Sequence, residues 1–199
     1  MNRESVEIAI DKAALRKLMV SQRRSLATEL RTSMNSAIAR HVIGLPEVAK
    51  ARHIHLYLSI PALVEVDTAP IIDGLASMDK KLLVPVIQKG VLVSALFRKG
   101  DVVVPGEFGQ PEPAEYVIAD ESHIDVVLLP LLAFDARGYR LGYGKGLYDR
   151  FLRRISEDGV KPYRIGLSFL QQKVEKVPID HWDEPLDAVV HQEGIFRYT

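Results

Sequence analysis

Two segments near the N-terminus have the apolar repeat of helices. Apolar side chains recur at three- and four-residue steps between residues 8 and 20, which predicts a helix there. A second helix is predicted from Ser25 or Thr28 to residue 42, because Gly44-Leu45-Pro46 would end it. Thr68-Ala69-Pro70 has the pattern of a helix cap with proline in the first turn, so a third helix is expected to run to about residue 78.

Shorter apolar runs predict strands between and after these helices. Residues 54–59 alternate between apolar and polar side chains, as a half-buried strand does. Residues 82–87 and 91–97 flank Lys89-Gly90 and are expected to pair as a hairpin. Residues 101–119 are rich in proline and glycine, and we expect a long irregular connection there.

The C-terminal half alternates between strand and helix patterns. Residues 124–130 are almost continuously apolar, which is typical of a strand covered on both faces. A helix is predicted from about residue 146 to 155, and strands at 164–169 and 188–190. This order predicts one domain over residues 1–199: a Rossmann-like, three-layer α/β/α fold with a mostly parallel sheet.

Composition excludes several classes of protein. Lysine plus arginine and aspartate plus glutamate each total 26, so the chain has no basic excess for non-specific nucleic-acid binding. It has no cysteine for a disulfide, a zinc ribbon or a thiol nucleophile. No apolar stretch approaches the roughly 18 residues of a membrane span, and no signal core follows the N-terminus. We therefore expect a cytoplasmic protein without a nucleic-acid or membrane partner. Since no heptad seam or long apolar edge is visible, a monomer is expected.

The segment 129–152 carries the most chemical information. A buried strand ends and a helix begins there, and ligands of open α/β sheets bind at the carboxyl ends of strands. Alternating glycines allow close backbone approach, while two cations and a helix N-terminus favour a polyphosphate. The spacing matches neither a Walker loop nor a dinucleotide fingerprint, and by itself it also fits a tight turn. The residues are Gly142, Gly144 and Gly146, with Arg140 and Lys145.

The order of residues in this segment closely resembles the signature of the 5-formyltetrahydrofolate cyclo-ligase family, also called 5,10-methenyltetrahydrofolate synthetases. The resemblance continues in the same order through most of the chain. The loop match comprises Ala133-Phe134-Asp135, Gly138, Arg140-Leu141-Gly142, Gly144, Gly146 and Tyr148-Asp149-Arg150. Further matches are Lys12-Ala13-Ala14-Leu15-Arg16, Glu65-Val66-Asp67-Thr68, Val177-Pro178, Trp182-Asp183 and residues 185–190, with a weaker one at Phe108-Gly109 and Glu112-Pro113.

This resemblance implies an ATP- and Mg²⁺-dependent ligase. Family enzymes convert 5-formyltetrahydrofolate to 5,10-methenyltetrahydrofolate and release ADP and phosphate. The formyl oxygen attacks the γ-phosphate, and N10 then closes the ring. Lys12 and Arg16 lie four residues apart on one predicted helix face, where the resemblance assigns them to ATP. The other implied ATP contacts are Arg140, Leu141, Gly142, Tyr143, Gly144, Lys145, Gly146 and Tyr148.

The resemblance also assigns the metal and the folate. Asp149 and Asp187 would bind Mg²⁺, which prefers hard carboxylate ligands. Glu65 would accept hydrogen bonds from the pterin, Leu58 would form an apolar wall, and Tyr148 would stack on the ring. Without the resemblance, each of these residues also has an ordinary interpretation. Asp149 could form an ion pair within its helix, Asp187 could be a turn aspartate, and Leu58 could be a core residue.

The remaining features have ordinary interpretations. Lys12 and Arg16 alone would be read as a solvated basic face, and Arg23-Arg24 as a solvated helix end. Trp182 is read as packing, and the histidines lack metal-ligand spacing. Two departures from many relatives concern the site: residues 60–64 are more apolar, and Leu147 replaces an aromatic residue.

Three alternative functions stay open beside the cyclo-ligase. They are another ATP-dependent enzyme on the same loops, a non-catalytic nucleotide or folate binder, and a sugar-phosphate isomerase-like protein.

Overall fold

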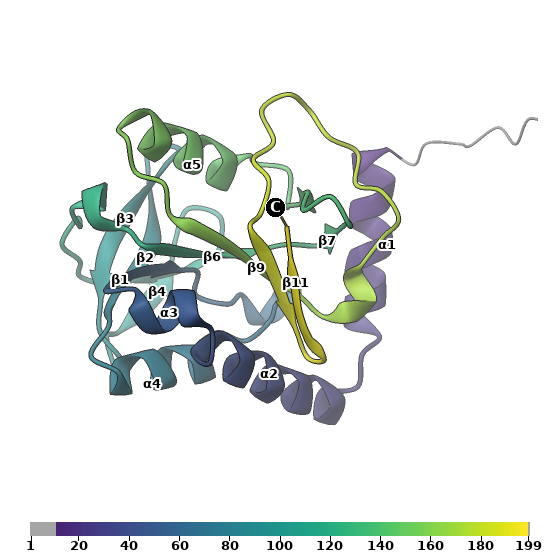
Figure 1. Cartoon of the computed structure of the whole chain (residues 1–199), viewed down its shortest axis with the longest axis horizontal. Coiled ribbons are helices and arrows are strands. Elements are labelled where there is room, and N and C mark those ends of the chain that lie inside the picture. The colour runs from purple at the N-terminus through teal and green to yellow at the C-terminus, as the bar shows by residue number, and fades with distance from the viewer. Residues whose placement is uncertain (1–10, 199) are drawn as a thin grey trace, which may run out of the picture.

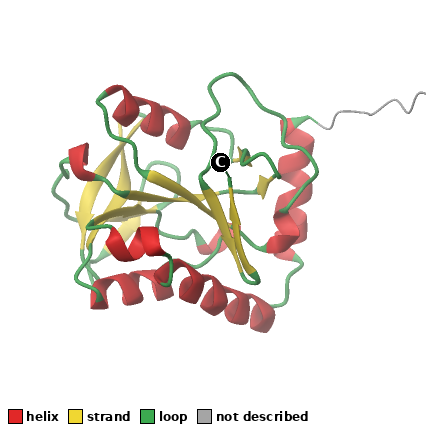
Figure 2. Ribbon diagram, viewed as in Figure 1, coloured by secondary structure: helices red, strands yellow, loops and turns green. Residues whose placement is uncertain are grey.

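The computed structural model describes residues 11–198, so residues 8–10 of the first predicted helix lie outside the described residues. A twisted sheet runs through the molecule, with helices on both of its faces (Figures 1 and 2). The helices are α1 (Lys12–Arg24), α2 (Thr28–Ile43), α3 (Pro46–Lys50), α4 (Ala69–Ser77) and α5 (Leu147–Glu157). The sheet strands are β1 (His53–Leu56), β2 (Lys81–Gln88), β3 (Val91–Phe97), β6 (Val126–Pro130), β9 (Tyr163–Leu167), β10 (Ala188–His191) and β11 (Gly194–Arg197).

Five central strands are parallel, which confirms the predicted sheet. The strand order is β11-β10-β9-β6-β1-β2-β3. β10, β9, β6, β1 and β2 pair in parallel, whereas β3 and β11 are antiparallel strands at the two edges. In this register Ile54 lies between Leu82 and Val126. The carboxyl ends of the parallel strands therefore lie along one edge of the sheet.

The apolar core lies on both faces of the sheet. Along β6, Val126 and Leu128 belong to the cluster that packs on α2 and α4. Val127 and Leu129 belong to the cluster that includes the apolar face of α5. Every residue of β6 except Pro130 is therefore buried, which explains its continuous apolar sequence. The predicted three-layer arrangement is confirmed.

Helix α1 lies at one side of the sheet rather than over it (Figure 1). Its Leu15 and Met19 pack against Leu141 of a two-stranded hairpin, β7 (Ala133–Phe134) and β8 (Arg140–Leu141), in a separate small core. This placement brings the polar face of α1 to the loop that follows β8.

The connection after β3 is more regular than predicted. It contains an antiparallel hairpin, β4 (Val103–Pro105) and β5 (Pro111–Pro113). The Glu112 carboxylate ties this hairpin to the sheet by accepting from the backbone N–H of Ile87 at 2.7 Å.

β11 and α3 were not predicted, and β1 ends at Leu56 rather than Ser59. Beyond β1 the Ser59 N–H donates to the Thr68 hydroxyl at 3.2 Å instead of to a neighbouring strand. Within residues 11–198 no helix combines the length and the apolarity needed to cross a bilayer.

Candidate active site

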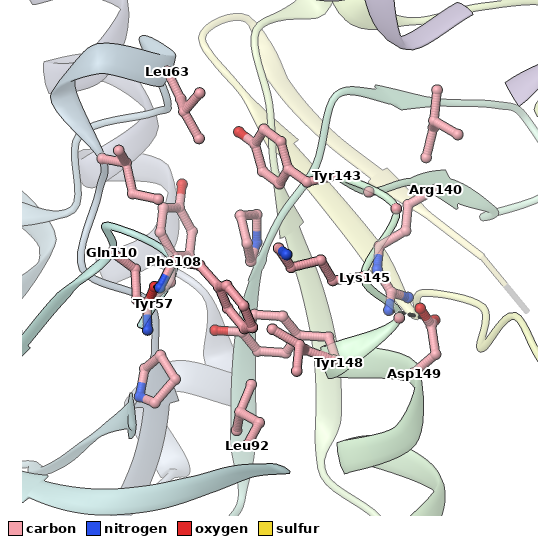
Figure 3. Close-up of a pocket in the computed structure, with 18 of the residues that line it drawn as sticks. Tyr57, Leu63, Leu92, Phe108, Gln110, Arg140, Tyr143, Lys145, Tyr148 and Asp149 are labelled. Carbon is pink, nitrogen blue, oxygen red and sulfur yellow. Dashed lines mark hydrogen bonds and ion pairs between the residues drawn. The ribbon is translucent and has the colours of Figure 1, made fainter. Parts of the chain in front are cut away.

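A pocket of about 390 Å³ opens at the carboxyl ends of β1 and β6 (Figure 3). This volume is within the range of small-molecule sites. One wall is the segment after β1, residues 57–65, and the opposite wall is the glycine-rich loop 142–146. The β4–β5 hairpin contributes Phe108 and Gln110, and α1 contributes Lys12 and Arg16. Segments far apart in the sequence thus meet at the edge where open α/β sheets bind ligands.

The glycine-rich loop has backbone conformations that favour glycine. Gly144 and Gly146 have φ angles of +95° and +60°, and Gly146 caps the N-terminus of α5. A Cβ atom on Gly144 would lie 3.2 Å from the guanidinium carbon of Arg16. Arg16 Nε donates to the Gly142 carbonyl at 2.9 Å, and its terminal nitrogens make no hydrogen bond within residues 11–198. The loop and α1 therefore present one free guanidinium edge at the α5 N-terminus.

Lys12 faces the same pocket, but two carboxylates already hold it. Its ammonium donates to Asp180 at 2.7 Å and to Asp183 at 2.6 Å. Desolvation opposes the charged form, yet the hydrogen bonds and charges of the two aspartates raise the pKa of Lys12 above its usual value. An ammonium has three N–H donors, so one remains for a ligand. Lys12 and Arg16 both line the pocket from one face of α1, and their contact with ATP stays a prediction.

Lys145 extends from the glycine-rich loop across the pocket toward the β4–β5 hairpin (Figure 3). Its Nζ lies 3.7 Å from the centre of the Phe108 ring, a cation–π contact. No carboxylate pairs with this ammonium in the described part of the chain. Lys145 and Arg16 are thus the cations here that an anionic ligand meets without competition from a protein carboxylate.

Arg140 and Asp149 bind each other. Arg140 Nη2 and Asp149 Oδ1 are 2.6 Å apart, and Arg140 Nη1 donates to the Glu184 carbonyl at 2.6 Å. The Arg140 side chain is only 4% exposed. Each terminal nitrogen therefore holds one protein oxygen, and the geometry makes Arg140 a clamp that closes the loop from β8 to α5. No partner occupies Asp149 Oδ2 in the described range, so this oxygen remains available in the pocket.

The structure does not bring Asp187 to Asp149. Asp187 lies before β10, at the amino end of that strand, and it is absent from the lining of the pocket. Both of its carboxylate oxygens bind the Arg164 side chain at 3.0 Å, and one also accepts from the Arg164 N–H at 2.7 Å. The paired metal site expected from the sequence is therefore not formed in this structure. Within residues 11–198, no group of three or more carboxylate or imidazole side chains is placed to hold a metal ion.

Glu65 is a buried carboxylate in the opposite wall. Its Oε2 accepts from the Ile60 N–H at 2.7 Å, so the apolar segment 60–64 wraps around it. Burial raises the pKa of Glu65, while the Ile60 hydrogen bond, the Tyr143 hydroxyl and the Arg23 charge oppose that rise. Half-buried Leu58 also lines the pocket, and its contact with folate stays a prediction. This wall can bind an apolar ring that carries N–H donors.

Tyr148 lies between the two walls, at the start of α5. Its ring meets His55 edge-on at 5.9 Å between centroids and Phe151 at 6.3 Å. Its buried hydroxyl has no partner within residues 11–198, and burial raises the pKa of Tyr148. A buried donor without a partner is unfavourable, so a ligand that accepts its hydrogen bond would be favoured.

Comparison with known proteins identifies the family of this chain. The model of the 5-formyltetrahydrofolate cyclo-ligase family matches residues 8–192. The chain belongs to the 5-formyltetrahydrofolate cyclo-ligase family. The 5-formyltetrahydrofolate cyclo-ligase of Escherichia coli strain K12 is 32% identical over 182 residues, covering 89% of this chain and 98% of that protein.

Two solved structures of 5,10-methenyltetrahydrofolate synthetases have the same fold. The NMR structure from Aquifex aeolicus has a TM-score of 0.81 at 32% identity, covering 94% of this chain and 92% of that one. The protein from Mycoplasma pneumoniae has a TM-score of 0.73 at 26% identity, covering 92% and 99%. The predicted cyclo-ligase family and α/β fold are confirmed.

Several residues in the pocket or behind its wall were not predicted, or were interpreted differently, from the sequence. Arg23 is 2% exposed rather than solvated, because Leu131 and Tyr143 accept its hydrogen bonds. Trp182 is 46% exposed and lines the pocket, so the packing interpretation is wrong. Phe108 was part of the weaker motif match to the cyclo-ligase family, which was the available signal for it. Other pocket residues without a predicted role are Tyr57, Leu63, Gln110 and Asp180.

Proposed function

We propose that this pocket carries out the cyclo-ligase reaction, converting 5-formyltetrahydrofolate to 5,10-methenyltetrahydrofolate at the expense of ATP. The activity is that of the family. One observation carries the assignment of the pocket: cations that lack a carboxylate partner line one wall, and a buried carboxylate among apolar side chains lines the other. A reaction between a triphosphate and a reduced pterin needs both walls to face each other.

The nucleotide phosphates bind at the glycine-rich loop. Arg16 and Lys145 supply charge, while the loop N–H groups and the α5 N-terminus supply further donors. Lys12 contributes its remaining donor. Arg140 acts on the nucleotide through loop shape, since its side chain is almost fully buried and each terminal nitrogen already holds a protein oxygen. The backbone near Gly142, Gly144 and Gly146, together with Leu141 and Tyr143, completes this side.

Asp149 is the residue that fits a magnesium ion. One of its oxygens is free in the pocket, and Mg²⁺ commonly takes one or two carboxylates plus phosphate oxygens and waters. The ion would neutralise charge on the phosphates. Because a multi-residue cage is absent from residues 11–198, Mg²⁺ is expected to arrive with ATP.

The folate binds beside Glu65. Its carboxylate accepts from the ring N–H and amino groups, Leu58 packs on the ring, and Tyr148 contributes its ring face and unpartnered hydroxyl. The formyl oxygen then faces the phosphates across the pocket. That oxygen forms a bond to the γ-phosphorus as the bond to ADP breaks. N10 next bonds to the formyl carbon and loses its proton, and the carbon–oxygen bond breaks to release phosphate. The protein supplies positioning and charge stabilisation.

The test mixes the protein with 5-formyltetrahydrofolate, Mg²⁺ and ATP and follows the near-ultraviolet absorbance of the methenyl product together with ADP. We expect equal amounts of both. Lys145→Ala should raise the KM for ATP about tenfold or more, since a charge-assisted hydrogen bond contributes about 1.5–3 kcal/mol. Lys161→Ala, at an exposed lysine outside this pocket, is the matched control. ADP without methenyl product would support the alternative of another ATP-dependent enzyme, and binding without turnover would support a non-catalytic binder. The cytoplasmic location and the monomeric state stay predictions.

A further inference from the structure

Arg23 is a buried cation that the proposed reaction does not use directly. It lies on α1 behind the pocket wall, 2% exposed, and makes no ion pair within residues 11–198. Nη1 donates to the Leu131 carbonyl at 3.2 Å, and Nη2 donates to the Tyr143 hydroxyl at 2.7 Å. Nε is buried without a partner. Burying a guanidinium in this way is costly, so its position calls for a compensating role.

Tyr143 connects Arg23 to the folate wall. It belongs to the glycine-rich loop, and its ring lies under the Arg23 guanidinium at 5.7 Å. Figure 3 shows Tyr143 reaching from this loop toward Leu63, which belongs to the segment that wraps Glu65. The hydroxyl accepts from Arg23 at 2.7 Å, Tyr143 and Glu65 both line the pocket, and a hydrogen bond from Tyr143 lowers the pKa of Glu65. Arg23, Tyr143 and Glu65 thus form a row from the inside of the protein to the pocket.

We propose that Arg23 is a positioning residue that acts through Tyr143 to keep the Glu65 carboxylate ionised and directed at the pterin. The proposal rests on the proposed function, in which Glu65 binds the folate. It also ties the nucleotide loop to the folate wall, because the same Tyr143 belongs to both.

The groups around Glu65 show why one cation matters. Tyr57 after β1, Tyr143 from the loop and Tyr148 from α5 are neutral phenols, because burial and the nearby Glu65 charge raise the pKa of each hydroxyl. Desolvation raises the pKa of Glu65, and the Ile60 N–H, the Tyr143 hydroxyl and Arg23 lower it. Arg23 contributes the only full positive charge among these opposing groups in the described chain. Without it, desolvation would act with less opposition and the carboxylate would protonate at higher pH.

The experiment measures kcat/KM for 5-formyltetrahydrofolate against pH for the wild type and for Arg23→Met. We expect the acidic limb of the profile to move up by about one pH unit. At pH values below the limb, kcat/KM of Arg23→Met should be about tenfold lower than that of the wild type, because one unit of pKa is a tenfold change in protonation. At high pH the two values should converge. The KM for ATP should change much less. Arg24→Met, at the exposed neighbouring arginine, should leave the profile unchanged.

Two further variants keep the proposal falsifiable. Tyr143→Phe removes only the hydroxyl and should move the limb in the same direction, so it serves if Arg23→Met does not fold. Arg23→Lys keeps the charge and should restore most of the profile. The proposal would be overturned if kcat/KM fell equally at all pH values in both Arg23→Met and Tyr143→Phe, or if the acidic limb did not move. A wild type that forms no methenyl product would instead refute the proposed function, so the two failures are distinguishable.

Discussion

The buried pair of Arg140 and Asp149 makes a quantitative prediction about stability. Asp149→Ala leaves a guanidinium that is 4% exposed without its counter-charge. Two unit charges about 4 Å apart attract by roughly 4 kcal/mol at an effective dielectric constant near 20. Removing one partner of a buried pair typically costs about 3–5 kcal/mol. Since the Asp149 side chain is 22% exposed, we take the lower end, about 3 kcal/mol.

Urea and thermal unfolding measure this free energy. For a chain of this size, a loss of about 3 kcal/mol should lower Tm by about 6–12 °C. The pair of Arg197 and Glu47 is the matched control, because its 2.6 Å separation is the same but its side chains are 46% and 27% exposed. Glu47→Ala should cost about 1 kcal/mol or less. In Arg140→Met/Asp149→Ala, part of the loss should return, because no unpaired buried charge remains. If Asp149→Ala destabilises no more than Glu47→Ala, the reasoning from burial is refuted.

Three further predictions concern the loop and two buried titratable groups. Gly144→Ala should raise the KM for ATP severalfold, because the added Cβ would press on Arg16. Gly159→Ala is the control, since Gly159 has a similar φ of +86° and open space around it. Both variants should lose about 1–2 kcal/mol of stability, but Gly159→Ala should leave ATP binding unchanged. A KM that rises equally in both would contradict this. Burial raises the pKa of Glu65, so ionisation of this carboxyl opposes folding above that pKa. Glu65→Gln should therefore raise Tm at neutral pH, and this gain should disappear below the ordinary pKa of glutamate. The same variant should weaken folate binding. An unchanged Tm at neutral pH would be evidence against the buried charge. Burial lowers the pKa of His55 to about 3, so below pH 6.5 the unfolded state binds one more proton than the folded state. The free energy of unfolding should therefore fall by up to about 1.4 kcal/mol for each unit that the pH is lowered. His55→Leu should reduce this slope in urea titrations, and an unaltered slope would contradict the prediction.

Local sequence patterns were sufficient for most of the fold. The continuous apolar run that became β6 is buried on both faces, and α4 begins after Thr68 with Pro70 in its first turn, although the Thr68 side chain makes no capping hydrogen bond. The hairpin of β2 and β3 also formed at Lys89-Gly90. These features depend on residue spacing and on backbone preferences within a few residues, which the sequence displays directly. The short hairpin of β4 and β5 could not be predicted, because a side chain bound to β2 helps to hold it.

Only the tertiary structure decided what the charged residues do. Lys12 pairs with aspartates about 170 positions away, Arg23 is buried behind Tyr143, and Asp187 binds Arg164 at the opposite end of its strand from the pocket. A long charged side chain has no periodic signature, and its partner depends on which segments the fold brings together. The sequence therefore determined the family, the sheet and the place of the glycine-rich loop. The three-dimensional arrangement determined which cations remain available for a phosphate and which carboxylate faces the folate wall.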